Sequence, residues 1–211
     1  MVRKKAQQTA EPYVPDNANI DKLRAASKLC HGCDLYKHAT QTVFGEGPKN
    51  ARIVLIGEQP GDSEDRTGHP FTGPAGRLLD KAFEAAGIAR EKVYLTNAVK
   101  HFGFQERGKS RLHKTPRIIE VNACFPWLEK ELEELKPDVI VCLGATATRA
   151  VLGPGVKVLE NRGKFIDSQW APHVMVTVHP SSILRAPDRD ARDQAMNAFI
   201  KDLKQITKFA A

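Results

Sequence analysis

The chain is 211 residues long; 41% of its residues are hydrophobic and 27% are charged, as is ordinary for a soluble globular protein. This length can bury a full core as one domain, and nothing in the composition requires two. The 32 basic and 25 acidic residues give a net charge of +7. That charge favours an anionic partner, nucleic acid before membrane, over the alternative of a basic protein with no polyanion partner. No apolar stretch approaches the roughly 18 residues of a membrane span, so we expect no membrane insertion.

The first residues of the chain are polar. Residues 1–5 are basic, but a polar run follows where a secretory signal would be apolar, so we expect an intracellular protein. We expect residues 1–17 to form a flexible tail and residues 18–211 to form a single domain.

Strand-like and helix-like segments alternate along the rest of the chain. Strands are predicted at residues 51–56, 93–95, 138–143 and 174–178, with a minor strand at 164–166. Helices are predicted at residues 74–86, 116–135, 145–152 and 190–209. The alternation predicts an α/β layer fold with a mostly parallel sheet.

The unusual residues of the chain follow the predicted strands. In open α/β sheets, ligands bind in the crevice at the carboxyl ends of the strands, so we expect these residues to line one cleft. They are Gly57, Glu58, Gln59 and Asp62 after the first strand, Asn97 after the second, and His179, Ser181 and Ser182 after the last. Phe71 lies on a stiff turn just before a helix N-terminus, where anions are favoured. The phosphate-loop and dinucleotide-binding patterns are absent, which argues against nucleotide chemistry.

Residues 100–114 form a long basic loop between the second strand and the following helix. Long loops inside compact domains are usually functional or disordered. The charged residues of this loop are Lys100, Arg107, Lys109, Arg111 and Lys114 against the single acid Glu106. The net charge of four (five minus one) predicts a phosphate contact. His113, near the end of the loop, suggests chemistry on the molecule that carries the phosphate, whereas His101 is expected to be a loop or surface residue.

The four cysteines indicate a metal or redox role, because disulfides are rare inside cells. Cys30 and Cys33 form a C-x-x-C pair, and Cys124 and Cys142 complete the count for a four-thiolate site that holds zinc or an iron–sulfur cluster. The alternative is that Cys124 and Cys142 are ordinary buried cysteines.

Four motifs in this order resemble the uracil-DNA glycosylase superfamily. They are Gly57-Glu58-Gln59-Pro60-Gly61, residues 68–76 (Gly-His-Pro-Phe-Thr-Gly-Pro-Ala-Gly), Thr96-Asn97-Ala98-Val99-Lys100 and His179-Pro180-Ser181-Ser182. With its four cysteines, the chain is most similar to the iron–sulfur branch. Residues 109–113, Lys-Ser-Arg-Leu-His, resemble the Lys-Arg-Arg-Ile-His signature of the UdgX-type glycosylases. Ser110 replaces an arginine that would contact phosphate, and Leu112 replaces isoleucine.

The resemblance implies a three-layer αβα fold with a central, mostly parallel four-stranded sheet, and removal of uracil from a flipped-out nucleotide. Phe71 would stack on the base, Asn97 would read its polar edge, and His179 would hydrogen-bond the leaving uracil. Glu58 takes the place of the catalytic carboxylate. The remaining implied roles are base fixation by Gly57 and Gln59, support by Asp62, phosphate binding by Lys109, Arg111, Lys114, Ser181 and Ser182, and a 4Fe–4S cluster on Cys30, Cys33, Cys124 and Cys142.

In the UdgX branch the loop histidine, here His113, attacks the sugar after uracil leaves, so the resemblance implies a covalent protein–DNA adduct. One alternative is a conventional glycosylase in which Glu58 directs water for multiple turnovers. Another is a non-catalytic, zinc-containing nucleic-acid-binding protein. We expect a monomer that acts on uracil-containing DNA, single- or double-stranded, in the bacterial cytoplasm.

Overall fold

The computed structural model describes residues 8–108 and 110–209. Its main sheet has five strands in the order β2-β1-β5-β7-β6, of which the first four are parallel and β6 is antiparallel to β7. The strands are β1 (Ile53–Gly57), β2 (Val93–Asn97), β5 (Val139–Leu143), β6 (Phe165–Ile166) and β7 (His173–Thr177). The expected four parallel strands are confirmed, and the predicted minor strand adds β6 as a fifth.

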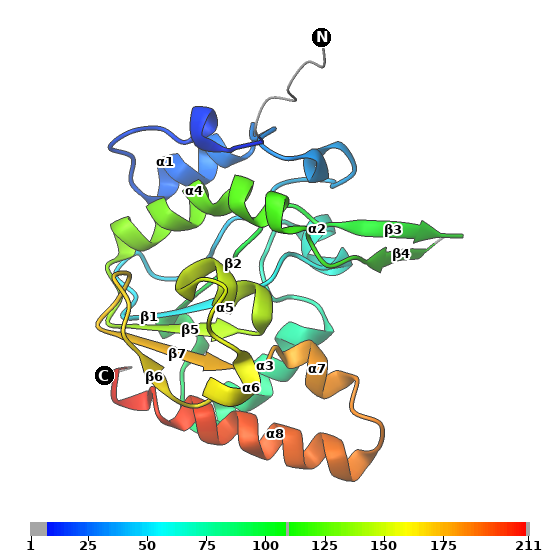
Figure 1. The fold of residues 1–211 in the computed structure, drawn as a ribbon, viewed down its shortest axis with the longest axis vertical. Coiled ribbons are helices and arrows are strands. Elements are labelled where there is room, and N and C mark those ends of the chain that lie inside the picture. Colours follow the sequence, from blue (N-terminus) through cyan, green and yellow to red (C-terminus); the bar gives the residue numbers. More distant parts are fainter. Residues whose placement is uncertain (1–7, 109, 210–211) are drawn as a thin grey trace.

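Helices cover both faces of this sheet (Figure 1). They are α1 (Ile20–Ser27), α2 (Asp62–Thr67), α3 (Pro74–Ala86), α4 (Ile118–Leu135), α5 (Ala145–Leu152), α6 (Val158–Asn161), α7 (Pro180–Leu184) and α8 (Arg189–Lys204). Short 3-10 helices lie at Glu11–Tyr13, Asp34–Lys37, Arg90–Lys92 and Thr207–Phe209. Among the residues described, no helix is long and apolar enough to cross a membrane.

Side-chain alternation along the strands divides the core into two layers, because successive residues of a strand face opposite sides of the sheet. Val54 and Ile56 of β1 pack with α1, α4 and α5, whereas Ile53 and Leu55 pack with α3, α7 and α8. The three-layer αβα architecture is therefore confirmed.

The basic segment expected to be a loop is largely a β-hairpin, so that part of the prediction is wrong. β3 (Phe104–Arg107) pairs antiparallel with β4 (Ser110–His113), and Gly108 in the turn has a φ of +59°. The hairpin extends outward from the body of the domain (Figure 1). Its strands were missed because most of their side chains are exposed and charged and carry no buried stripe. Lys109 lies outside the described residues.

The N-terminal segment packs against the domain from Ala10 onward. Ala10 is buried, and its backbone N–H donates to the carbonyl of Ala123 in α4 at 2.7 Å. The tail expected over residues 1–17 thus includes a packed portion, and residues 1–7 lie outside the part that the structure describes.

Candidate active site at the carboxyl edge of the sheet

The candidate site lies where the parallel strands end. Gly57 of β1 is in register with Asn97 of β2, and Leu143 of β5 is in register with Thr177 of β7. The loops that leave these four strands therefore begin side by side at one edge, where α/β sheets bind ligands. The cleft predicted at this edge would be lined by residues of these loops.

Gly57 allows two site residues to approach the end of β1 closely. A Cβ atom at Gly57 would lie 2.3 Å from Oδ1 of Asn97 and 2.8 Å from Cζ of Phe71. Both side chains are nearly inaccessible, with 3% and 5% of their residue surfaces exposed. The Phe71 ring also lies beside the His179 ring, with centroids 6.3 Å apart and planes inclined by 28°. We use the name edge pocket for these four closely packed residues, Gly57, Phe71, Asn97 and His179, as a label for the group and not for a measured cavity.

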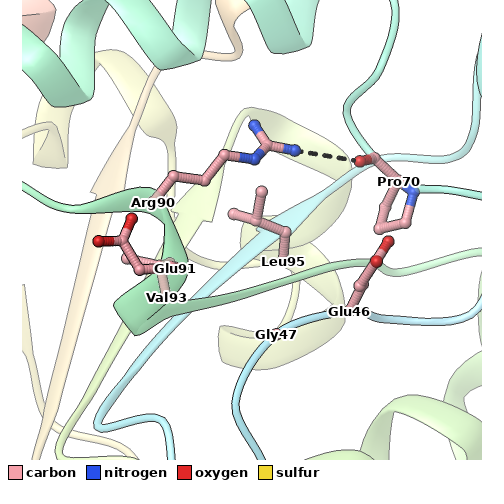
Figure 2. A pocket seen from close by; sticks show the side chains of 7 residues that line it. All are labelled: Glu46, Gly47, Pro70, Arg90, Glu91, Val93 and Leu95. Atoms are coloured by element: carbon pink, nitrogen blue, oxygen red, sulfur yellow. Dashed lines mark hydrogen bonds between the residues drawn. The ribbon is translucent and has the colours of Figure 1, made fainter.

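Phe71 is held in a backbone conformation that non-glycine residues rarely adopt. Its φ is +57°, a strain that persists only where neighbouring contacts enforce it. Arg90 crosses a pocket of about 330 Å³ at the outer edge of β2 (Figure 2), and its Nη2 lies 3.4 Å from the carbonyl oxygens of both Pro70 and Phe71. Gly76 leaves room for the Phe71 carbonyl on the other side. The ring is thus positioned by its own turn.

Glu64, which the sequence did not single out, joins this turn to the loop after β1. Its buried carboxylate accepts the N–H of Gly73 at 2.7 Å and the N–H of Gly61 at 3.0 Å. Its position three residues after Gly61 is that of a capping-box carboxylate at the start of α2, a signal that the sequence does contain.

His179 is a neutral hydrogen-bond donor. Burial lowers its pKa to about 4, with a smaller contribution from the charge of His113. Its Nδ1 accepts the backbone N–H of Ser181 at 3.2 Å, so in the neutral ring the proton resides on Nε2. Ser181 Oγ also lies 2.9 Å from Nδ1, and Ser182 Oγ donates to the His179 carbonyl at 2.7 Å. The two serines expected at phosphates therefore orient His179 in this structure.

Glu58 and His113 form a pair beside the edge pocket. Nε2 of His113 lies 3.3 Å from Oε1 of Glu58, although the two residues are 55 positions apart in the chain. The side chain of Glu58 is 23% exposed and that of His113 is 48% exposed, so both remain accessible. Thr146 at the start of α5 donates a hydrogen bond to the other oxygen of Glu58. The carboxylate is therefore fixed between the sheet edge and the hairpin.

Gln59 fastens the hairpin to the loop that carries Glu58. Its side-chain Nε2 donates to the carbonyls of Gly103 and Lys114 at 3.0 Å each, and its Oε1 accepts the N–H of Gly103 at 3.1 Å. Gly103 precedes β3 and Lys114 follows β4, so one amide side chain closes the neck of the hairpin. Gln59 was expected to fix the base, but its amide atoms are engaged by backbone.

Arg111 also ties the hairpin to the domain, where a phosphate contact was expected. Its Nε donates to Asp62 at 2.5 Å and its Nη1 to Asp65 at 2.6 Å. The guanidinium also lies over the rings of Phe102 and Phe104. Only 15% of the Arg111 side chain is exposed. Asp62 correspondingly anchors β4 to α2.

Lys100 is another basic residue whose expected role changes. It is fully buried and pairs with buried Glu131 of α4, and its Nζ also donates to Thr96 Oγ1 at 2.7 Å and to the Asn97 carbonyl at 2.8 Å. A charge held in this way supports the end of β2 and is inaccessible to phosphate. Lys114 and Ser182 are exposed at the site, and Lys109 lies outside the described residues.

Three of the four cysteines lie together between the N-terminal segment and α4. Burial raises the pKa of the Cys124 thiol, and nearby Cys33 and Cys30 raise it further, which places the three thiols close together. Each of the three sulfurs also accepts N–H hydrogen bonds. The donors are Trp127 Nε1 and the Gly32 amide to Cys30 (3.2 and 3.5 Å), the Lys100 amide to Cys124 (3.2 Å), and the Leu35 and Tyr36 amides to Cys33.

Cys142 does not join this group. It lies within β5, in register with Ile56 of β1 and Val176 of β7, and is fully buried in the apolar core. Within residues 8–108 and 110–209, no N–H donor reaches its sulfur, and no three His, Cys, Asp or Glu residues are placed to hold a single metal ion. His101, expected to be a loop or surface residue, lies in the loop between β2 and β3 but is only 5% exposed.

The chain is similar to known proteins over most of its length. Residues 44–204 match the model of the uracil DNA glycosylase superfamily. The type-4 uracil-DNA glycosylase of Thermotoga maritima is 40% identical over 183 residues, which are 86% of this chain and 90% of that protein. The type-4 enzyme of Archaeoglobus fulgidus is 35% identical over 195 residues, 89% of this chain and 92% of that protein. The type-5 enzyme of Pyrobaculum aerophilum is 35% identical over half of each chain. The chain therefore belongs to the uracil-DNA glycosylase superfamily.

Proposed function

We propose that this protein excises uracil from DNA and that His113 then becomes covalently bound to the abasic sugar. Membership of the superfamily and similarity to type-4 enzymes support the excision step. One observation carries the covalent step: Nε2 of His113 lies 3.3 Å from Glu58, on the rim of the edge pocket. The substrate is uracil-containing DNA, single-stranded or double-stranded with the nucleotide flipped out.

The edge pocket supplies the contacts that a uracil base needs. The Phe71 ring offers an aromatic face, and the Asn97 amide can pair with the polar edge of the base. The glycosidic C1′–N bond breaks with its electron pair leaving on uracil, so negative charge develops on the base. Nε2–H of neutral His179 donates to that charge, and a donor positioned in advance stabilises the transition state.

The Glu58–His113 pair supplies the nucleophile for the sugar. Carbon C1′ carries positive charge as uracil leaves, and the nearby Glu58 carboxylate stabilises it. The imidazole bonds to C1′ through the Nε2 lone pair of the tautomer that carries its proton on Nδ1, and the ring gives up that Nδ1 proton once the bond has formed. Overall one C–N bond breaks and another forms, and the proton given up by the imidazole ends on the uracil anion.

We assign an iron–sulfur cluster to the region of Cys30, Cys33 and Cys124. Burial raises the pKa of the Cys33 thiol to about 11, and the N–H donors at the three sulfurs partly offset this cost of forming thiolates, which are the ligand form of cysteine. The three thiols are not placed to hold a single metal ion, and they would instead hold separate irons of a cluster. Such a cluster would cross-link the N-terminal segment to α4 without a redox step in excision.

A denaturing gel tests the proposal. The protein is incubated with labelled single-stranded DNA that contains one uracil, then heated in detergent. We expect a slowly migrating protein–DNA band, and we expect His113→Ser to abolish this band. The control is His38→Ser, which replaces an exposed histidine distant in sequence and should leave the band unchanged.

Two other results would contradict the proposal in different ways. Free abasic DNA without a retained band would show a conventional glycosylase that turns over with water directed by Glu58. Retention of intact uracil in the DNA would exclude excision, as expected for a non-catalytic zinc-containing binding protein.

A further inference from the structure

Thr146 lies beside the Glu58 carboxylate because of the order of strands in the sheet. β1 and β5 are adjacent and parallel, with Ile56 in register with Cys142. Glu58 follows the end of β1 and Thr146 follows the end of β5, so both residues lie at the same edge of the sheet. The hydroxyl of Thr146 donates a hydrogen bond to Oε2 of Glu58. A residue 88 positions away in the chain thus holds one oxygen of the carboxylate.

The first turn of α5, which carries Thr146, is itself held in place. Thr148 donates both its backbone N–H, at 3.1 Å, and its hydroxyl, at 2.8 Å, to the carbonyl of Gly144. Gly144 has a φ of +85°, and a Cβ atom there would lie 3.0 Å from the Cβ of His179. This turn therefore packs closely against His179, and the Thr146 hydroxyl has a defined position.

The two oxygens of the Glu58 carboxylate have different neighbours. Oε1 lies 3.3 Å from Nε2 of His113, a separation that leaves no room for a water molecule between the two atoms. Rotation of a carboxylate about its last bond has no sharp preference of its own, so hydrogen bonds decide which way the oxygens face. The hydrogen bond from Thr146 to Oε2 therefore keeps Oε1 directed at His113.

We propose that Thr146 is a positioning residue that directs the Glu58 carboxylate toward His113 and away from water. This inference rests on the proposed function and concerns why the abasic sugar stays attached to the protein. In a conventional glycosylase, the oxygen of a water bonds to C1′ and a proton of that water passes to the carboxylate. That step needs a carboxylate oxygen turned toward water, whereas here Oε1 faces His113 and Oε2 faces Thr146.

The ratio of adduct to free abasic DNA after a single round of excision tests the proposal. Thr146→Val keeps the branched shape of the side chain but removes the hydroxyl, which leaves Oε2 free to accept a water. We expect the ratio to fall by about tenfold or more, because a hydrogen bond to a charged group contributes that much. Thr146→Ser retains the hydroxyl and should restore the ratio. Both products come from folded, active molecules, so the ratio does not depend on how much of a variant folds.

Thr207→Val is the matched control. Thr207 is also half-buried, and its hydroxyl donates one hydrogen bond, to the Lys204 carbonyl at 2.9 Å, so this variant should keep the ratio of the unmodified protein. An unchanged ratio in Thr146→Val, or an equally low ratio in Thr146→Ser, would overturn the inference and leave the proposed function standing. An unmodified protein that releases only free abasic DNA, or that leaves uracil in place, would overturn both.

Discussion

The edge pocket and the β3–β4 hairpin meet at Glu58, but they are built in different ways. The edge pocket follows from the parallel sheet, whose aligned strand ends bring Gly57 and Asn97 together. The hairpin lies outside that sheet and is attached through side chains, chiefly Gln59 and Arg111. The proposed contacts with the base thus depend on the fold itself, whereas the placement of His113, the proposed nucleophile, depends on a few added contacts. Substitutions should separate the two.

The largest expected effect is a loss of stability when the buried Lys100–Glu131 pair, which supports the end of β2, is broken. Lys100→Met removes the cation that neutralises Glu131 and leaves a buried, unpaired carboxylate. We expect the free energy of unfolding to fall by about 3–5 kcal/mol. Lys130→Met is the matched control because it breaks the exposed pair with Glu133 on the same helix, and it should cost less than about 1 kcal/mol. Chemical denaturation measures both, and equal losses would contradict the role of Lys100.

Gly57→Ala tests the pocket without removing any group. The new Cβ would displace the Asn97 amide and the Phe71 ring, so we expect uracil excision to slow by about 10²-fold. Gly155→Ala introduces the same methyl group where no atom lies within 4 Å and should leave the rate unchanged. Single-turnover excision measures both, and full activity of Gly57→Ala would contradict the close approach.

Gln59→Ala tests the hairpin. It removes three hydrogen bonds at the neck, each worth about 1 kcal/mol net, so we expect adduct formation to slow by about tenfold or more. Uracil release should change less, because the edge pocket is intact. Gln205→Ala, which removes one amide–backbone bond remote in sequence from the hairpin, is the control. Equal slowing of release and adduct formation would show that the hairpin and the pocket act as one unit.

The last effect is nearly absent at neutral pH: it is a pH dependence of stability that comes from His179. In the unfolded chain His179 takes up a proton near its ordinary pKa of 6.5, but burial lowers the folded-state pKa to about 4. The unfolded state thus binds more protons between these values, and stability should fall as the pH falls from about 6.5 to 4. His179→Asn should reduce that dependence. Denaturation at several pH values measures it, and an identical slope in the variant would contradict the neutral state of His179.

The sequence predicted the edge pocket better than the hairpin for a physical reason. Apolar strands that end in glycine, asparagine or histidine carry a strong local pattern, and parallel pairing then brings their ends together. The strands of the hairpin are exposed and charged, so no hydrophobic pattern marks them.

Long-range pairing was hidden from sequence reasoning as well. Lys100 was counted with the surface charges because Glu131 lies 31 residues later, in a helix with many other acids. Arg111 was assigned to phosphate because its partners Asp62 and Asp65 belong to α2, a helix that was not predicted. Burial of a charge is decided by a partner from another element, and that pairing leaves no local signature.

Because Gln59 closes the neck of the hairpin, the length of the hairpin can change without changing its base. The amide joins Gly103 to Lys114, and Lys114 is the immediate neighbour of His113. The proposed nucleophile is thus fixed at the root of the hairpin, while β3 and β4 extend outward from the domain (Figure 1). Residues added or deleted at the tip would alter the reach along DNA without moving the histidine. The hairpin tip is therefore a natural place to change strand preference or to insert a reporter sequence.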